Sequence, residues 1–385
     1  MSTYTQDSLL RIARRVNNTK RTYLLVNPLQ AKHIPVSPTR SLGMMNSLGH
    51  LLAGKYPGTR LVIGFAETAT AVGAAVADCF PKNCVYLTTT REPAPAVEKW
   101  VRFTEEHSHA TEQKLCGDGL EDRIRRTDSV IFVDDEISTG KTLRNVIAQL
   151  RAHYPQLTEK RLVAASILNR VSREDEALLN RAGVVCEYLL KISDDRAAQI
   201  AEAYDVTEGT PVQATEPLVL SHRGLDCPAL PVLCVGTEIG TLQAGCYNMA
   251  RAFWKQAGPV LKELGSAVVL GTEECMYPAL ILGQTLEEEG LSVRCHATTR
   301  SPIGICSASG YPITSGHKLP SFYKDTRTTY LYNFTPCEAL IIVSDAPVFQ
   351  RSALEQLAAA WKPYGYQKLF FILAGRDVWY TEGRT

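Results

Sequence analysis

Short apolar runs alternate with longer amphipathic stretches along the first 205 residues. Runs rich in Val, Ile and Leu predict strands, and the amphipathic stretches that follow several of them predict helices. The predicted strands are Tyr23–Asn27, Leu61–Phe65, Val85–Thr89, Val130–Asp134, Leu162–Ile167 and Val185–Leu190, and the predicted helices are Thr39–Lys55, Glu67–Cys79, Gly140–His153 and Asp194–Tyr204. Nearly continuous apolar strands separated by helices are typical of a parallel sheet with both faces covered. Residues 1–205 are therefore expected to form an open α/β domain.

The regular pattern is interrupted between residues 206 and 230. The stretch Asp205–Pro231 contains four prolines and has no clean period, so 206–230 is predicted to be a linker between domains. Alternation resumes afterwards, with predicted strands at Val232–Val235, Ala267–Leu270, Leu291–His296, Ala339–Val343 and Leu369–Leu373. Residues 231–385 are expected to form a second α/β domain.

The two halves carry similar residues in the same order. Each has a glycine at a strand end with a glutamate three residues on, then a TTR tripeptide, then a strand ending in aspartate. The intervals agree closely: 27 and 29 residues for Gly64–Arg91 and Gly271–Arg300, 44 and 45 for Arg91–Asp135 and Arg300–Asp345, and 16 and 17 for Arg91–His107 and Arg300–His317. Shared spacing in this order indicates duplication of a whole domain. We therefore predict two tandem open parallel-sheet domains, the second a diverged copy, with residues 20–190 matching 230–375 strand for strand.

Composition narrows the functional classes. Lysine and arginine number 41 against 40 aspartates and glutamates, so no overall charge attracts nucleic acid or an anionic membrane, and nucleic acid is not expected as a partner. No run approaches eighteen consecutive apolar residues, and the N-terminus lacks the apolar core of a signal peptide, so a soluble cytoplasmic protein is expected. The eleven cysteines form no CxxC pair, which argues against a disulfide scaffold or a zinc ribbon.

The most specific motif is VIFVDDEISTGKTLRNVI, Val130–Ile147. An apolar strand leads into two carboxylates, a short polar turn and a helix, so the turn can direct several backbone N–H groups and the positive helix end at one phosphate. The turn contains Ser138, Thr139, Gly140, Lys141 and Thr142. Carboxylates at the strand end, Asp134 and Asp135, suit vicinal ribose hydroxyls with metal-bound waters within reach. A triphosphate P-loop is excluded because Asp135 stands where that motif requires glycine.

The order of strand, two aspartates, TGxT turn and helix resembles the phosphoribosyl diphosphate (PRPP) loop of type I phosphoribosyltransferases. The resemblance extends to GFAETAT, where it implies pyrophosphate binding by Glu67, Thr68 and Ala69, and to TTREP, where it implies a pyrophosphate contact from Arg91. It implies PRPP as a substrate with Mg²⁺ bound to it, and no metal held by the protein alone. It also implies a catalytic lid at Phe103–Leu115, with His107, His109 and Lys114, and a base-selecting hood at Asn27–Pro38, with Lys32 and His33 binding the acceptor.

The tetrapeptide Thr299-Arg300-Ser301-Pro302 narrows the resemblance. A transferase domain followed by this sequence resembles the orotate phosphoribosyltransferase-like proteins encoded with tellurium-resistance genes, whose C-terminal TRSP domain is named after it. The resemblance covers nearly the whole chain. It implies a bacterial metabolic role with a small-molecule, nucleobase-like acceptor, and type I relatives are commonly dimeric, which implies a homodimer. It does not identify the acceptor.

The second half departs from the phosphate motif. Val343–Leu354 keeps one carboxylate, Asp345, but lacks the TG pair, and Pro347 removes a donor. Binding of a ribose 5-phosphate is therefore not expected there. A polar cluster remains at the corresponding strand ends, consisting of Glu273, Glu274, Arg300, Ser301, His317 and Lys318. It predicts a site for a different ligand, with a role as scaffold as the alternative.

Two other functions compete with a PRPP-dependent transferase. A non-catalytic, PRPP-sensing regulator would need a nucleic-acid surface, and the basic segment Arg11–Arg21 is the best candidate for one. A PRPP synthetase-like kinase also pairs two such domains, but the chain shows no ATP-binding signature, and that family carries its intact phosphate loop in the second half. The transferase is the leading hypothesis, with His109, Lys114, Asp134 and Asp135 as its catalytic residues.

Overall fold

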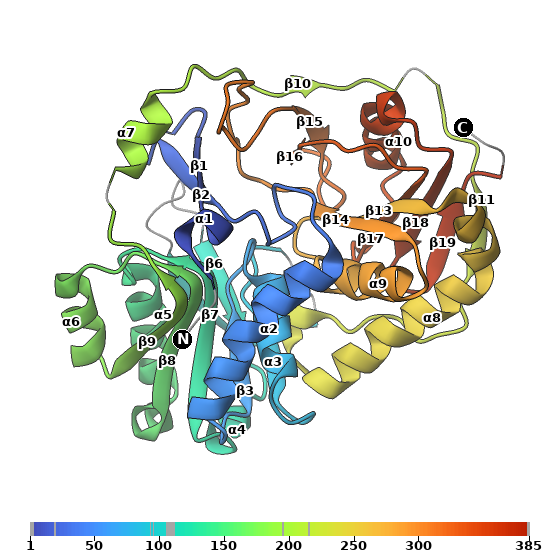
Figure 1. Cartoon of the computed structure of the whole chain (residues 1–385). Helices are drawn as coiled ribbons and strands as arrows, with labels where there is room; N and C mark the ends of the chain where they lie inside the picture. Colours follow the sequence, from blue (N-terminus) through green and yellow to red (C-terminus); the bar gives the residue numbers. More distant parts are fainter. Residues whose placement is uncertain are drawn as a thin grey trace. The chain divides into compact units, whose positions relative to one another are not determined.

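The computed structural model describes residues 4–382 apart from 19–20, 93, 95, 105–111, 195 and 215. The chain forms two compact units (Figure 1). The first contains residues 1–6, 43–193 and 231–243, and the second contains 7–42, 194–230 and 244–385. The predicted boundaries were continuous, whereas both units are assembled from separate segments.

The first unit is built on a six-stranded sheet in the order β12-β4-β3-β7-β8-β9. Its strands are β3 (Leu61–Gly64), β4 (Val85–Thr88), β7 (Ser129–Ile137), β8 (Arg161–Asn169), β9 (Val184–Lys191) and the edge strand β12 (Thr237–Glu238). All but β12 run parallel. The predicted parallel sheet is therefore confirmed, and β7 continues three residues beyond the predicted end at Asp134.

Helices cover both faces of this sheet, as the apolar strands require. Its helices are α3 (Thr70–Asp78), α4 (Leu120–Arg125), α5 (Lys141–His153) and α6 (Arg173–Arg181), and α2 (Pro38–Lys55) precedes β3. The apolar side of α5 packs with Ile63, Leu87 and Phe132 in one core. On the opposite face Tyr86 contacts α3 by donating to the carbonyl of Thr70 (2.6 Å). A hairpin of β5 (Trp100–Thr104) and β6 (Glu112–Cys116) lies between β4 and β7 in the sequence.

The second unit contains a six-stranded sheet in the order β14-β13-β17-β18-β19-β11. Its strands are β13 (Ser266–Gly271), β14 (Ser292–Ala297), β17 (Ala339–Ser344), β18 (Lys368–Leu373), β19 (Asp377–Tyr380) and β11 (Ser221–Gly224). The helices are α9 (Tyr277–Glu288), α10 (Arg351–Trp361) and the last part of α8 (Ile239–Leu264), and Figure 1 shows α9 and α10 on opposite sides of the sheet. Side chains alternate accordingly, because Phe370 contacts Phe253 of α8 while Phe371 lies in the α10 core.

Smaller elements complete the second unit. They are α7 (Ala197–Glu202), the hairpin β1–β2 (Arg11–Arg14 and Tyr23–Val26), the hairpin β15–β16 (Gly316–Pro320 and Thr328–Tyr332) and β10 (Thr210–Pro211) alongside β15, whereas the four-residue helix α1 (Gln6–Leu9) begins in the first unit. The predicted strand at Tyr23–Asn27 therefore pairs with β1 in a separate ribbon and not with the parallel sheet. Short 3₁₀ helices occur at Pro155–Glu159, Leu233–Val235 and Lys362–Tyr364.

Two further predictions of local structure are wrong. The apolar run Val232–Val235 contains a 3₁₀ helix in place of a strand, and Val232 is 60% exposed, so the run has no partner strand that would bury it. The predicted linker 206–230 is built into the second unit, because β11 pairs with β19 and Leu218 and Leu220 pack against the α10 core. Backbone pairing and apolar burial compensate for its irregular pattern.

The predicted duplication holds for four strands. The order β4-β3-β7-β8 recurs as β14-β13-β17-β18, all parallel. Equivalent backbone bonds recur as well: Phe65 N donates to Val133 O as Thr272 N does to Val343 O, and Thr89 N donates to Gly64 O as Thr298 N does to Gly271 O. The hairpins β5–β6 and β15–β16 occupy the same place in the two halves, each with seven residues between its strands.

The fifth strand breaks the strand-for-strand correspondence. β9 follows helix α6 and is parallel to β8, whereas β19 follows β18 through a tight turn and is antiparallel. Ala374 and Gly375 both have positive φ in this turn, a geometry that directs a strand straight back. The predicted equivalence of His107 and His317 is also wrong. When β5 and β15 are aligned from their first residues, His317 of β15 corresponds to Val101 of β5 and not to His107.

Candidate functional site

Three loops of the first unit meet at the carboxyl edge of its sheet. β4, β3 and β7 are neighbours, and Gly64 at the end of β3 lies in register with Thr88 and with Val133. Because the strands are parallel, the segments that follow them emerge at the same edge. The segments that the sequence motifs singled out, residues 65–69, 89–91 and 134–142, are therefore brought together.

Contacts of Tyr86 hold the loop after β3 and the start of α3 in place. Tyr86 fills the space that the missing side chains of Gly64 and Gly73 leave, since a Cβ on either glycine would lie under 3.0 Å from the tyrosine ring or hydroxyl. The Tyr86 hydroxyl donates to Thr70 O at the start of α3 (2.6 Å). Ala69 is the N-cap of α3, and Glu67 and Ala69 are buried while Thr68 is half-buried.

A buried glutamine joins the loops after β3 and β4. Gln113 of β6 donates to Ala66 O (3.1 Å) and accepts from the hydroxyl of Thr89 (2.6 Å), while the Ala66 N–H donates to the same hydroxyl oxygen (2.9 Å). Each polar group is thereby satisfied away from water. Arg91 follows two residues after Thr89 and is half-buried. Gln113 was not identified from the sequence, because a single glutamine in a short strand gives no periodic signal.

The two aspartates at the end of β7 are half-buried and face different neighbours. Thr68 donates its hydroxyl hydrogen to Asp135 Oδ1 (2.7 Å), which links the loop after β3 to β7. The backbone N–H of Asp135 donates to Asp134 Oδ1 (2.9 Å). A carboxylate oxygen of Asp135 therefore lies beside the loop that carries Glu67, Thr68 and Ala69.

The turn after β7 requires glycine at the start of α5. Gly140 is the N-cap of α5 with φ 67° and ψ 12°, a conformation that favours glycine. A Cβ at this position would lie 2.8 Å from Cδ1 of Leu179, which is fully buried. Ser138, Thr139 and Thr142 are half-buried and Lys141 is exposed, so the N-terminal end of a 13-residue helix stands close to solvent.

The predicted lid falls largely outside the described residues. His107 and His109 belong to that part, segment 105–111, and their role stays a prediction. Lys114 is described: its backbone N–H and C=O pair with Thr90 after β4 (3.0 and 2.9 Å), and its ammonium lies 4.3 Å from the centre of the Trp100 ring. The base of the hairpin is thereby attached next to Thr89 and Arg91.

The residues predicted to bind the acceptor lie in the second unit. Lys32 is 1% exposed and donates to the backbone carbonyls of Glu273 (2.7 Å) and Thr298 (3.0 Å). His33 is also buried, and its carbonyl accepts from Asn333 (3.0 Å). These contacts stabilise the loops after β13 and β14, and the role of Lys32 and His33 toward an acceptor stays a prediction.

The second unit gathers several of its predicted site residues at the corresponding edge. Glu273 is fully buried and accepts from Arg300 (2.6 Å), from Arg327 (3.0 Å) and from the Ser321 hydroxyl. Arg300 also pairs with Glu274 (3.2 Å). His317 lies apart from these bonds, since its ring contacts Thr210 and Phe334. Ser301 donates its N–H to Thr299 Oγ1 (3.2 Å) and shapes the turn after β14.

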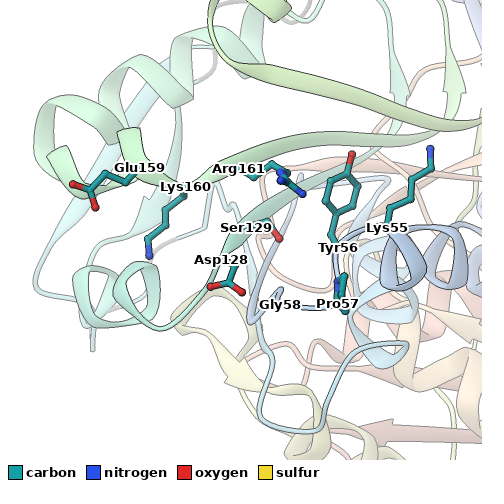
Figure 2. Close-up of a pocket in the computed structure, with 9 residues that line it drawn as sticks. All are labelled: Lys55, Tyr56, Pro57, Gly58, Asp128, Ser129, Glu159, Lys160 and Arg161. Carbon is teal, nitrogen blue, oxygen red and sulfur yellow. The ribbon is translucent and has the colours of Figure 1, made fainter.

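A hollow of about 560 Å³ in the first unit lies at the opposite edge of the sheet. It is lined at the amino ends of the strands by Gly58, just before β3, and by Ser129 and Arg161, which begin β7 and β8. Figure 2 shows Lys55, Tyr56 and Arg161 on one side of it and Asp128 and Lys160 on the other. Mixed charges line this hollow, and none of the residues that the motifs singled out contributes to it.

Two family models match separate parts of the chain. Residues 9–193 match the model of a family described as phosphoribosyl transferase. Residues 242–360 match a model described as the TRSP domain C-terminal to that phosphoribosyl transferase domain. The resemblance inferred from the motifs is confirmed at this level. No curated protein matches the chain.

Solved structures of phosphoribosyltransferases are similar to about half of the chain. The adenine enzyme of Giardia lamblia, complexed with 9-deazaadenine, is 14% identical, with 50% of this chain and 99% of that chain covered and a TM-score of 0.37. The orotate enzyme of Aeropyrum pernix is 17% identical, with 52% and 96% covered and a TM-score of 0.31. The adenine enzyme of Trypanosoma brucei, complexed with AMP, pyrophosphate and ribose 5-phosphate, is 14% identical, with 48% and 76% covered and a TM-score of 0.33.

The described part of the chain offers neither a membrane-spanning helix nor a preformed metal site. None of its helices is long and apolar enough to cross a membrane. Within the same residues, no group of three or more His, Cys, Asp or Glu side chains is arranged to hold a metal ion. Asp134 and Asp135 nevertheless fit Mg²⁺ that arrives with a diphosphate, because this ion keeps several waters and takes one or two carboxylates together with substrate phosphates.

Proposed function

We propose that the first unit transfers the 5-phosphoribosyl group of PRPP to a nucleobase-like acceptor and releases pyrophosphate. The observation that carries the proposal is the convergence of the loops after β3, β4 and β7 at one sheet edge. The match of residues 9–193 to a phosphoribosyl transferase model supports it.

The 5-phosphate is assigned to the turn Ser138–Thr142. Backbone N–H groups at the start of α5, the hydroxyls of Ser138, Thr139 and Thr142, and the positive end of the helix all favour an anion there. Lys141 adds a charge at the solvent side.

The ribose and the pyrophosphate are assigned to the neighbouring loops. The carboxylates of Asp134 and Asp135 accept from the ribose hydroxyls, and Mg²⁺ bound to the diphosphate neutralises their charge. Pyrophosphate meets the backbone of residues 67–69 and the guanidinium of Arg91. The hydrogen bond from Thr68 to Asp135 (2.7 Å) couples these two subsites, so the ribose and the leaving group are held by one connected structure.

In the reaction the bond between ribose C1 and pyrophosphate breaks, and pyrophosphate leaves with the electron pair. A lone pair on an acceptor nitrogen forms the new bond to C1, and the proton of that nitrogen passes to solvent or to a base. The protein contributes positioning and stabilisation of the leaving charge. His109 and Lys114 are the proposed proton donors to pyrophosphate.

The biological context, the oligomeric state and the acceptor are inferred from the resemblance alone. A link to tellurium resistance, a homodimer and the acceptor's identity remain predictions. The non-catalytic, PRPP-sensing alternative is less well supported, because arginines of its basic segment have partners in the second unit: Arg14 donates to Tyr204 O (2.9 Å) and Arg21 lies over the Tyr23 ring (4.7 Å).

The first test is stabilisation of the full chain by PRPP with Mg²⁺. Ligand at about 100 times its dissociation constant should add roughly 2.7 kcal/mol to the free energy of unfolding. The double variant Asp134→Asn/Asp135→Asn should lose this gain. The control is Asp122→Asn on α4, whose side chain is 69% exposed, and it should keep the gain. A folded wild type that PRPP does not stabilise would contradict the proposal, and stabilised protein justifies screening acceptors by pyrophosphate release.

A further inference from the structure

Glu273 stands where the first unit has alanine. The two positions make the same backbone hydrogen bond: the N–H of Glu273 donates to Thr298 Oγ1 (2.9 Å) as the N–H of Ala66 donates to Thr89 Oγ1 (2.9 Å). The arginines that follow two residues after those threonines, Arg300 and Arg91, are equivalent by the same pairing. The two positions therefore correspond, although Glu273 has a positive φ and Ala66 does not.

The carboxylate of Glu273 is enclosed by donors. Its side chain is 0% exposed, and it accepts from Arg300 Nε (2.6 Å), Arg327 Nη1 (3.0 Å) and the Ser321 hydroxyl. Ser321 and Arg327 come from the two ends of the segment between β15 and β16. A buried carboxylate held by two guanidiniums and a hydroxyl has the coordination that a bound phosphate oxygen would have.

The backbone of Glu273 supports a special role. Its φ is 45°, in the left-handed region that non-glycine residues rarely adopt. Such strain persists only where surrounding contacts hold it. Lys32 provides one of these contacts, because its ammonium donates to the carbonyl oxygen of Glu273 (2.7 Å).

We propose that Glu273 is an internal anion that occupies the second unit's counterpart of the pyrophosphate subsite and excludes phosphate-class ligands from it. The equivalence of Arg300 with Arg91 as a pyrophosphate contact rests on the proposed function. The pairing of Arg300 and Arg327 with the single carboxylate of Glu273 does not depend on the proposed function, because the structure shows it directly. On this view Glu273 ties the β15–β16 segment to the sheet edge in place of a ligand.

The test is creation of an anion site by removing the carboxylate. In the full chain, Glu273→Ala leaves two guanidiniums without their shared partner, which lowers the melting temperature. Inorganic pyrophosphate without Mg²⁺ should then raise the melting temperature of the variant by roughly 3 °C or more beyond its effect on wild type. Titration calorimetry should find one more pyrophosphate site per chain in the variant than in wild type. The matched control, Glu273→Ala/Arg300→Met, should lose both gains.

Each outcome decides the proposal. Equal pyrophosphate effects on wild type and Glu273→Ala, or a gain that survives Arg300→Met, would overturn it. If Glu273→Ala shows no cooperative unfolding transition, Glu273→Gln keeps the shape and removes the charge, and the same comparison with wild type applies. A separate measurement tests the proposed function: it is contradicted if PRPP with Mg²⁺ does not stabilise the wild-type protein.

Discussion

Gly140 is the position where phosphate chemistry and packing depend on the same missing side chain. It caps α5 with φ 67°, and a Cβ there would lie 2.8 to 3.2 Å from three side-chain carbons of Leu179. Gly140→Ala therefore imposes two costs, a left-handed alanine and an overpacked contact. Leu179 is fully buried, so it cannot move into solvent to relieve the contact.

The chain offers a matched control for the first cost. Gly119 caps α4 with φ 65° and ψ 4°, and the nearest atom to a Cβ at this position would be Nε of the flexible Arg123 side chain, at 4.0 Å. Gly119→Ala should cost about 1 kcal/mol from the backbone alone. Gly140→Ala adds roughly 1–3 kcal/mol from overpacking, for a total of about 2–4 kcal/mol.

Urea denaturation of both variants and wild type measures these costs, compared at a common slope. Hydrogen exchange of the peptides that cover α4 and α5 locates the change within the first unit. A Gly140→Ala variant no less stable than Gly119→Ala would refute the packing argument. In addition, PRPP should stabilise Gly119→Ala as it does wild type but stabilise Gly140→Ala less, because the anion-binding turn has moved.

Three other predictions follow from buried polar groups. Gln113→Leu should cost about 1–3 kcal/mol and weaken PRPP binding, since two partners lose their bonds; equal urea midpoints for variant and wild type would contradict this. Tyr86→Phe should cost about 1 kcal/mol by removing the bond to Thr70 O, again by urea denaturation. Burial lowers the pKa of His296 to about 4. Between pH 6.5 and 4 the unfolded chain therefore binds a proton at His296 that the folded chain does not. The free energy of unfolding should fall by about 3 kcal/mol over this range. His296→Asn should flatten that part of the pH profile.

The strands that carry the site were predictable because burial on both faces leaves a plain apolar signal. β3, β4, β7 and β8 were each expected within a few residues of their observed bounds. The hairpins β5–β6 and β15–β16 were not, because their sequences mix polar and apolar residues without a strict period. The strand prediction for Val232–Val235 was wrong for the opposite reason: the run is apolar, but Val232 is exposed and the other three residues are only half-buried. Only the tertiary structure decides which apolar runs are buried.

The features of the candidate site likewise include some that the sequence could predict and some that it could not. Residues next to one another in the sequence, such as Asp134 and Asp135 or the turn at Gly140, could be assigned from a motif because the local backbone creates the site. Partners distant in sequence could not: the bond from Thr68 to Asp135 spans 67 residues, and that from Lys32 to Glu273 spans 241. Such pairs depend on sheet order, which spacing alone does not reveal.

The two halves share backbone contacts at the sheet edge but differ in the side chains that line it. The pairs Ala66–Thr89 and Glu273–Thr298 have the same N–H to hydroxyl bond at the same length, so this contact between the two loops is kept in both units. Loss of a phosphate site in the second half therefore does not require a change of fold. On the proposal for Glu273, a carboxylate in place of alanine, within reach of Arg300 and Arg327, blocks the counterpart of the pyrophosphate subsite. The missing TG pair and Pro347 act separately, on the counterpart of the 5-phosphate turn. The same replacement made in the first unit, Ala66→Glu, should therefore abolish PRPP stabilisation, while the urea midpoint of the ligand-free protein falls by less than that of Gly140→Ala.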